Sequence, residues 1–356
     1  MSFILGGQAT GDVANVLMAN NMDPYCLKPY IGADGRSYIN RNSGKVDKDG
    51  QPIYNALVTN APATLRKDQW ISLDTAVIKA AQPRLNAVGD LRRAGLQLSL
   101  TGGMGNISLE HEKQSDISDA RVSMSPVSQA EADRPEYSLE SLPLPIIYKD
   151  FQFDVRQVMA SRRAPGNPLD TTTAELAGRK VGEEAERLLL GEASTYQYGG
   201  GTVYGYKNHP DRLTKSLTAP TTSNHPTTVS EVLAMREQSV AAGYYGDWVL
   251  YYSPAWYAFM DEDYTTTVNQ AWTLRSRLEA IQGITAVKPA DYLTGTTLLL
   301  VQQTSDVARE VVGMDITTVQ WATQGGMMLN FKVMAILVPQ IRSDYYGKTG
   351  IVHGSV

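Results

Sequence analysis

Apolar and polar positions follow a helical period between Asp170 and Gly191, which predicts one long helix with clear ends. The positions that share its apolar face are Ala174, Ala177, Val181, Ala185 and Leu188. Thr172 and Glu175 have the spacing of a capping box, and Gly191 suits the left-handed conformation that ends a helix. A helix of about 20 residues is about 30 Å long, enough to run the length of a subunit.

Two further apolar patterns precede this helix. Leu142–Tyr148 is an extended apolar run with prolines, and Phe151 and Phe153 continue it in alternation, which predicts strand structure. Residues 68–94 carry apolar side chains at helical spacing. Proline lacks the amide N–H and clashes with the preceding turn, so Pro83 is expected to kink this helix or split it in two.

The pattern after the long helix predicts two connections and then an α/β region. Residues 196–202 are expected to form a loop, and residues 215–227, rich in Thr, Ser and Pro, a linker. Thr228 and Glu231 are suited to cap a helix that runs to Ala242. Later strands are expected at 248–252, 296–302, 331–338 and around Ile316, Val319 and Trp321, with helices after Ser253-Pro254 and at 273–281, a turn at Gly325-Gly326 and a polar, Gly-rich tail at 344–356.

Two segments carry too few apolar residues to form a core of their own. In residues 1–65, two Asp-Gly turns each lead into a short strand, which predicts an arm that packs on another domain or another copy. In residues 96–141, strand patterns at 97–101 and 107–112 flank a glycine turn, and the polar stretch 114–137 follows. We expect this second segment to project from the body and to be mobile until a partner orders it.

The composition describes a globular chain of 356 residues with 42% apolar and 19% charged residues and a net charge of −5. The mild acidity argues against a protein whose main task is to grip nucleic acid phosphates. Cys26 is the single cysteine, which excludes an intramolecular disulfide and a cysteine metal cluster. The first residues do not have the pattern of a signal peptide, and no apolar window is long enough to predict a membrane span.

Candidate catalytic chemistry is sparse in the sequence. The four histidines, His111, His209, His225 and His353, form no zinc-binding spacing. The glycine clusters at 103–105 and 199–201 lack the further residues of a nucleotide-binding loop, so we interpret them as turns. We therefore predict no catalytic, cofactor-binding or metal-binding residues, and an enzyme remains only an alternative without an identified site.

The aromatic composition favours contacts between proteins. The chain has 19 Tyr and five Phe, and tyrosine combines a large ring with a polar group, which suits interfaces. Ordinary strand and loop positions are an equally good interpretation of the paired tyrosines. The candidates for contacts between subunits are Tyr38, Tyr54, Tyr244 and Tyr245, together with Lys113 and Arg121 of the polar loop.

The order of these elements resembles the encapsulin-like branch of the Hong Kong 97-type major capsid proteins of tailed bacteriophages. The resemblance covers about residues 66–342 and depends on element order more than on any single motif. It rests on Trp70, Asp74, Ala76 and Val77 in the first helix, on Leu142–Ile146, Phe151–Asp154, Arg162-Arg163 and Leu189–Gly191, and on the last strand at 331–338.

The resemblance implies an α+β chain with the Hong Kong 97-like capsid fold, including a peripheral domain built on a long spine helix and an axial α/β domain. The expected parts are the N-terminal arm 1–65, a helix within 66–95, the extended loop 96–141, the peripheral domain 142–228 with its spine helix 170–191, the axial domain 229–330, and 331–356 as the return to the peripheral domain and C-terminal tail.

The function implied is that of a major capsid protein that self-assembles into pentamers and hexamers of an icosahedral phage head around packaged double-stranded DNA. Expected partners are other copies, a portal, a decoration or scaffold protein and, by weak non-specific contact, the DNA; no membrane is expected. The chain would be part of the virion and assemble in the host cytoplasm.

The alternative is an encapsulin-type shell that holds a cargo enzyme. The long loop and some 65 residues before the Trp70 helix favour the viral shell. Some relatives cross-link the loop through a lysine to an asparagine of a neighbour. Lys113 is the only lysine between Lys79 and Lys149 and hence the only candidate in this loop, but nothing in the sequence identifies its partner.

Overall fold

The computed structural model describes most of the chain and leaves several segments undescribed. The described residues are 29–46, 52–58, 65–82, 85–100, 103–115, 122, 124, 134, 137–163, 171–221, 224–264, 273–324 and 327–356. The sequence predictions that lie outside these residues concern Pro83, the Asp49-Gly50 and Gly325-Gly326 turns, Arg121 and most of the polar stretch 114–137.

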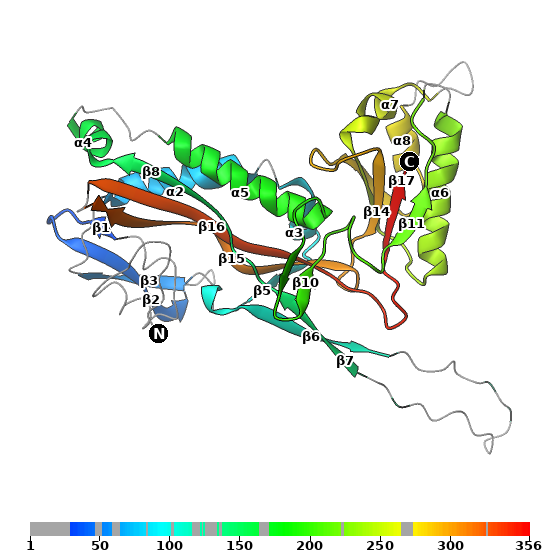
Figure 1. The fold of residues 1–356 in the computed structure, drawn as a ribbon, viewed down its shortest axis with the longest axis horizontal. Coiled ribbons are helices and arrows are strands. Elements are labelled where there is room, and N and C mark those ends of the chain that lie inside the picture. The colour runs from blue at the N-terminus through cyan, green and yellow to red at the C-terminus, as the bar shows by residue number, and fades with distance from the viewer. Residues whose placement is uncertain are drawn as a thin grey trace.

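A four-stranded sheet with the strand order β5-β15-β16-β8 forms the long axis of the molecule (Figure 1). β15 and β16 pair as one long antiparallel ribbon, β8 pairs antiparallel with β16, and β5 pairs parallel with β15. The strands are β5 Gln97–Ser99, β8 Ile147–Asp154, β15 Ala308–Thr323 and β16 Met328–Ile341. Phe151 and Phe153 of β8 point to the buried face, as their alternation predicted, and stack around Phe331 of β16.

Helix α5 (Thr172–Leu190) packs against β8 and β16 of this sheet and against α2 (Lys67–Ala81). The two helices meet through glycines: a Cβ atom on Gly178 would lie 2.6 Å from the carbonyl oxygen of Val77, and one on Gly182 would lie 2.9 Å from that of Ala81. The sequence pattern showed the apolar face of α5 correctly, but it gave no sign that its glycines form the contact.

The ends of α5 confirm one prediction and correct another. Gly191 ends the helix in the left-handed conformation, with φ 84°, as predicted. The predicted capping box is wrong, because Thr172 already lies inside the helix and Thr171 occupies the N-cap. The hydroxyl of Thr171 instead donates a hydrogen bond to the Glu175 carboxylate over 3.0 Å.

The predicted helix at 68–94 is divided in two, as expected around Pro83. α2 ends at Ala81, and α3 (Asn86–Arg93) begins five residues later, while Pro83 itself lies outside the described residues. Helix α3 is short but deeply placed, since Ala87, Val88 and Leu91 are buried. α4 (Val155–Arg163) directly follows β8, and a 3-10 turn, Gly103–Gly105, follows β5.

A second sheet of five strands lies at the other end of the molecule from β1–β3 (Figure 1). Its order is β11-β17-β14-β12-β13, and Val249, Tyr251, Leu299 and Val301 join its core to that of the first sheet. The strands are β11 Leu213–Ser216, β12 Trp248–Tyr252, β13 Ile284–Pro289, β14 Thr297–Gln302 and β17 Ile351–Ser355. The helical elements beside it are α6 His225–Ala241, η4 Pro254–Trp256, α7 Tyr257–Asp261 and α8 Leu274–Glu279.

The start of α6 corrects the predicted cap at Thr228 and Glu231. The helix begins at His225, after Asn224, so Thr228 lies within it and is buried. Glu231 instead accepts hydrogen bonds from the amide and the hydroxyl of Thr218, at 2.9 and 2.7 Å. The Pro226 ring sits in the first turn, where no intrahelical amide bond is lost.

Three segments predicted as a loop, a linker and a tail contain strands. Tyr196–Tyr198 (β9) and Gly201–Val203 (β10) form a small hairpin, and the last two residues of β11 lie within the predicted linker. The predicted polar tail contains β17, which lies between β11 and β14. The sequence pattern did not predict this strand because it contains Gly354. A Cβ atom on Gly354 would lie 2.6 Å from the side chain of Leu217, which covers the glycine.

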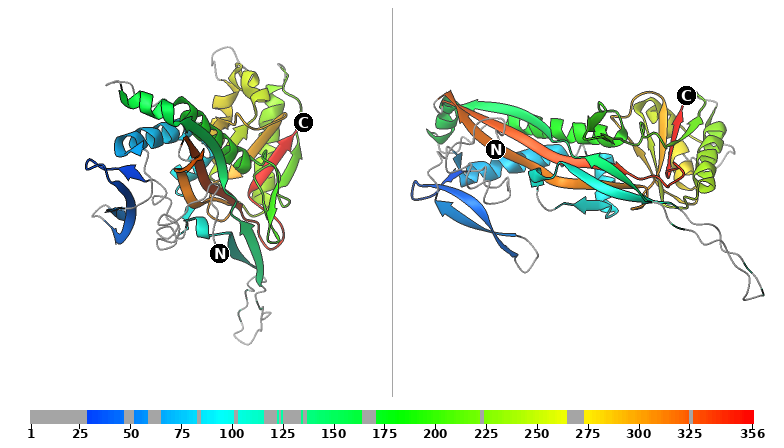
Figure 2. Two further views of the ribbon diagram at one scale, coloured as in Figure 1. Left: turned by 60° about the vertical axis from the view of Figure 1, so that its left-hand side comes forward. Right: turned by 60° about the horizontal axis from the view of Figure 1, so that its bottom comes forward.

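The N-terminal arm forms a four-stranded sheet with the order β3-β2-β1-β4, which stands beside the main sheet in Figure 2. Its strands are β1 Tyr30–Ile31, β2 Ser37–Val46, β3 Pro52–Val58 and β4 Leu65–Arg66. The arm is attached to the body where Leu65 is buried and where the Trp70 indole donates a hydrogen bond to the Pro29 carbonyl over 3.0 Å. Gly35 forms the predicted turn with φ 78°.

Strands β6 (Ser108–Gln114) and β7 (Tyr137–Pro143) form an antiparallel pair that extends away from both sheets (Figures 1 and 2). We call this pair the β6–β7 ribbon. Only its root is packed, where Leu142 and Leu144 join Val203 and Val311 in a small apolar cluster. The predicted projection of residues 96–141 is therefore confirmed for the ribbon itself.

Candidate functional site

Several polar side chains gather at the root of the β6–β7 ribbon. A cleft of about 310 Å³ lies there, lined by His111 and Lys113 of β6, Glu140 of β7, and His209 and Asp211 of the loop after β10. The Lys113 ammonium lies 2.7 Å from the Glu140 carboxylate and 3.9 Å from that of Asp211. The lysine predicted as the cross-linking candidate is thus paired within its own chain.

Three of the described histidines make contacts within the fold of the chain. His209 is buried and its Nδ1 accepts a hydrogen bond from the Asp211 amide; burial lowers its pKa to about 4. His353 of β17 lies beside Arg212, and burial likewise lowers its pKa to about 4. His225 stacks on Phe259 at 4.5 Å. Among the described residues, no three His, Cys, Asp or Glu side chains gather to hold a metal ion.

The tyrosine candidates fall into two regions of the fold, with Tyr38 and Tyr54 in the N-terminal arm and Tyr244 and Tyr245 just before β12. Tyr38 belongs to the N-terminal arm, where it stacks on Tyr30 and donates a hydrogen bond to Asp34 over 2.7 Å. Tyr54 is placed in β3 by its backbone alone. Tyr244 is half-buried and donates to the Lys348 carbonyl over 2.8 Å, which ties the C-terminal segment to the second sheet.

Among the candidates whose side chains the structure describes, Tyr245 is the most accessible, with 71% of its surface exposed. Its carbonyl accepts a hydrogen bond from Gln302, while its ring faces solvent. Burial raises the pKa of the neighbouring Tyr244 to about 12, which agrees with an intrachain role for that residue. The five candidates that the structure describes, which exclude Arg121, therefore do not gather at one place in the subunit.

The structure contains an apolar groove that the sequence analysis did not predict. It has a volume of about 580 Å³ and lies between the start of β8 and the C-terminal half of α5. Ile146, Tyr148 and Tyr196 line it and are 39%, 60% and 43% exposed. The apolar run Leu142–Tyr148 predicted a strand here. The interpretation of residues 196–202 as a loop gave no sign that Tyr196 also lines the groove. An open apolar surface of this kind is typical of a contact site for another protein.

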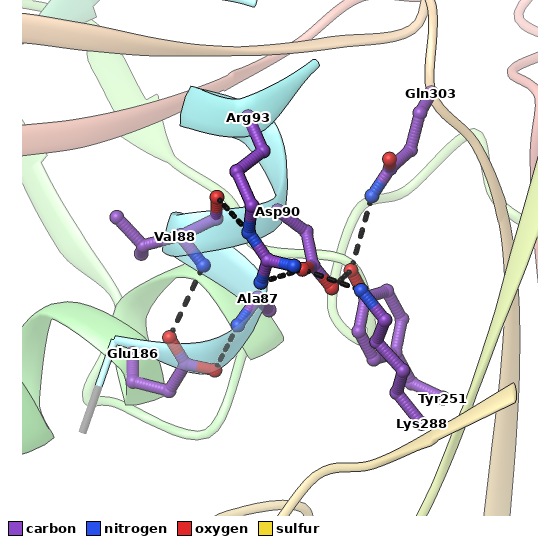
Figure 3. Close-up of polar contacts among 9 residues, drawn as sticks. Ala87, Val88, Asp90, Arg93, Glu186, Tyr251, Lys288 and Gln303 are labelled. Atoms are coloured by element: carbon purple, nitrogen blue, oxygen red, sulfur yellow. Dashed lines mark hydrogen bonds and ion pairs between the residues drawn. The ribbon is translucent and has the colours of Figure 1, made fainter. Parts of the chain in front are cut away.

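A buried polar cluster joins the two sheets through α3 (Figure 3). Asp90 of α3 is 3% exposed and binds three groups: the hydroxyl of Tyr251 at 2.8 Å, the ammonium of Lys288 at 2.7 Å and the guanidinium of Arg93 at 2.5 Å. Gln303 also donates to the Tyr251 hydroxyl, over 3.1 Å. The cluster fixes α3 to β12 and β13 of the second sheet.

Glu186 of α5 holds the other end of α3. Its carboxyl group, 2% exposed, accepts hydrogen bonds from the amides of Ala87 at 2.6 Å and Val88 at 3.2 Å. Burial raises the pKa of Glu186 to about 7; the two amides lower it and the charges of Asp90 and Asp291 raise it further. Nothing in the sequence marked this glutamate, because its partners lie about one hundred residues earlier.

No helix among the described residues has the length and apolar composition needed to cross a membrane. A search by sequence among curated proteins finds no match. A model of a family of unknown function, DUF6260, matches residues 60–354.

Solved structures show which fold this is. A virus-like particle from Pyrococcus furiosus is similar with a TM-score of 0.57 and 16% identity, over 80% of this chain and 98% of that one. The capsid of Myoviridae phage XM1 is similar with a TM-score of 0.55 and 12% identity, over 74% of this chain and 90% of that one. The structure from Mycobacterium phage Bobi is similar with a TM-score of 0.52 and 13% identity, over 73% of this chain and 88% of that one. These likenesses confirm the predicted Hong Kong 97-like α+β fold, and the family match shows that the chain belongs to the DUF6260 family.

Proposed function

We propose that the protein is a major capsid protein, which self-assembles into the pentamers and hexamers of an icosahedral phage head that encloses double-stranded DNA. The observation that carries this proposal is the fold, which the chain shares with the capsid of Myoviridae phage XM1 over 90% of that chain. Among the residues that the structure describes, no three His, Cys, Asp or Glu side chains gather as metal ligands. A structural role in a shell accounts for both facts.

The surface of the single chain supports assembly. The β6–β7 ribbon extends into solvent, and at its end Val122 and Met124 are fully exposed. The apolar groove beside α5 is open as well. Such surfaces are stabilised when other copies cover them, and contacts that join unlike surfaces close into rings. We expect more than about 2,000 Å² of interface in total for each subunit.

The parts of the subunit take the following roles in this proposal. The segment 96–141 lies over a neighbouring copy, α5 is the spine of the peripheral domain 142–228, and the axial domain 229–330 gathers around five-fold and six-fold axes. β11 and β17 join the axial sheet from outside that range, whereas β15 inside the range pairs with β16 in the first sheet. The axial domain of this proposal therefore takes in 213–216 and 351–355 and ends before Ala308. The arm 1–65 contacts a second copy.

Further partners belong to the same proposal. A phage head needs a portal, and a decoration or scaffold protein is a further partner of this chain. The net charge of −5 suits only weak, non-specific contact with packaged DNA. The protein is then a component of the virion that assembles in the host cytoplasm.

An encapsulin-type shell that holds cargo enzyme is the second candidate. It is supported by the likeness to the virus-like particle from Pyrococcus furiosus, which covers 98% of that chain. The arm sheet that precedes α2 and the length of the β6–β7 ribbon favour the viral head, because both provide contacts that hold neighbours together under internal pressure.

Purified particles distinguish the two candidates. Particles from infected cells, treated with nuclease to remove external nucleic acid, should have a high ratio of absorbance at 260 to 280 nm, because DNA is enclosed. A ratio typical of protein alone, with a second protein species inside the shell, would favour the cargo-holding compartment. A chain that stays monomeric in sedimentation experiments would contradict both.

A further inference from the structure

The two faces of the β6–β7 ribbon carry different side chains. In its antiparallel register Leu139 lies opposite Glu112, and Tyr137 lies opposite Gln114. Residues paired in this way point to the same face of a ribbon. Tyr137 and Leu139 are 61% and 64% exposed, and Glu110, two residues from Glu112, shares their face. We call the four residues Glu110, Glu112, Tyr137 and Leu139 the acidic face.

The charges of the acidic face are not neutralised within the part of the chain that the structure describes. On the other face of the ribbon, His111 and Lys113 both lie against Glu140. Glu110 and Glu112 are exposed, and neither forms an ion pair with another described residue. The acidic face therefore presents two apolar side chains and two carboxylates to solvent.

The apolar groove has the complementary chemistry. Besides its apolar residues it is lined by Lys149 and Lys180, whose side chains are exposed. Glu184, the acidic residue of this lining, lies 4.0 Å from Arg187 of the same helix. The groove thus combines an apolar surface with an excess of positive charge. Apolar side chains flanked by carboxylates fit such a surface by hydrophobic contact and by charge attraction.

The ribbon of the same chain is held away from this groove. β7 ends at Pro143 and the groove begins at Pro145, so the two surfaces start from one point in the chain. Leu142 and Leu144 are buried there, and the ribbon extends from them away from both sheets (Figures 1 and 2). Tyr137 is about 20 Å along the strand from Pro143. The acidic face can therefore meet a groove only in another molecule.

We propose that the acidic face of one copy docks in the apolar groove of a second copy of this chain. The inference rests on the proposed function, since it names the two surfaces through which neighbouring subunits of the shell meet. The two surfaces are unlike, so each subunit donates one ribbon and receives another. Head-to-tail contacts of this kind close into rings.

Chemical cross-linking of assembled particles tests the contact. Leu139→Cys and Tyr196→Cys are introduced together with Cys26→Ser, because Cys26 is the single native cysteine. A flexible bis-maleimide should join the chains into a ladder on a denaturing gel that extends to five and six subunits. The matched control combines Leu139→Cys with Tyr346→Cys, which is 69% exposed and lies outside the groove. This control should remain monomeric on the gel.

Charge reversal tests the same contact without cysteines. Glu112→Lys and Lys149→Glu should each raise the concentration needed for assembly about threefold or more, because each places like charges together. The two changes in one chain should return it to within about twofold of the wild-type value. Glu112→Lys combined with Lys79→Glu, an exposed residue of α2, should show no recovery.

Shells that yield only monomers or internally linked chains from the Leu139–Tyr196 pair would overturn this inference and leave the proposed function intact. Equal ladders from that pair and from the Tyr346 control would also overturn it, since the contact would not be specific to the groove. The same holds if the double charge reversal shows no recovery. A wild-type chain that forms no shells would contradict the proposed function and this inference with it.

Discussion

Gly178 of α5 lies against the backbone of Val77 in α2 so closely that a Cβ atom would stand 2.6 Å from the Val77 carbonyl oxygen. We expect Gly178→Val to push the two helices apart and to reduce the free energy of unfolding by about 1 to 3 kcal/mol. Thermal unfolding of the purified chain measures this change.

Gly89 in α3 provides the control for that substitution. Its nearest neighbouring atom would lie 3.9 Å from a new Cβ, and its helical backbone suits alanine. Gly89→Ala should therefore leave the stability unchanged or raise it by up to about 1 kcal/mol. Equal losses in Gly178→Val and Gly89→Ala would show that close helix contact is not the cause.

Asp90 links α3 to the second sheet, and its removal should be costly. Asp90→Ala leaves the partly buried Lys288 ammonium and the buried Tyr251 hydroxyl without their carboxylate, so we expect a loss of about 3 kcal/mol in the free energy of unfolding. Chemical denaturation measures it. The exposed pair Arg275–Glu279 is the reference: Arg275→Ala should cost less than about 1 kcal/mol.

His209 predicts a sensitivity to acid. Its pKa is lowered from 6.5 to about 4 by burial, so the folded chain binds this proton more weakly than the unfolded chain. The stability associated with the neutral ring is complete above about pH 6.5 and is lost as the pH falls towards 4. His209→Asn keeps an acceptor for the Asp211 amide and should show a smaller loss over this range; an identical acid profile in both proteins would refute the assignment.

The β6–β7 ribbon should be needed for assembly and dispensable for folding. Deletion of Gln114 to Ala132 removes residues outside the packed root of the ribbon, so we expect a folded monomer with a normal circular dichroism spectrum that does not form stable shells. Normal particles from this variant in electron micrographs would refute the role given to the ribbon.

The apolar groove should be a contact between copies. Tyr148 is 60% exposed there, and a charge at this position would remain solvated in the monomer but be buried in an assembly. Tyr148→Glu should unfold at the wild-type temperature and fail to form particles. Tyr346, 69% exposed and outside the groove, is the control; assembly by Tyr148→Glu and Tyr346→Glu alike would show that the groove is not an interface.

Local signals in the sequence identified several parts of this fold. Gly191 ends α5, and the alternation of Phe151 and Phe153 marks β8, because each depends on the neighbouring residues alone. The order of elements then indicated the capsid fold, which the structural likenesses confirm.

Contacts distant in sequence account for what the patterns missed. β17 contains Gly354 and appears polar, and only Leu217 in the folded chain explains why a glycine is tolerated in that sheet. The amides that donate hydrogen bonds to Glu186 lie about one hundred residues earlier in the chain, so the spacing of Glu186 within α5 gives no sign that it contacts α3. The sequence identified no partner for Lys113, and only the pairing of β6 with β7 brings it beside Glu140.

Cryo-electron microscopy of the assembled protein tests the central claim most directly. The account predicts closed icosahedral shells in which this 38.9 kDa chain is repeated, with the five-stranded sheet around the five-fold and six-fold axes and α5 lying away from them. A preparation that contains only monomers or small open oligomers, at concentrations where the chain is folded, would contradict a shell-forming role.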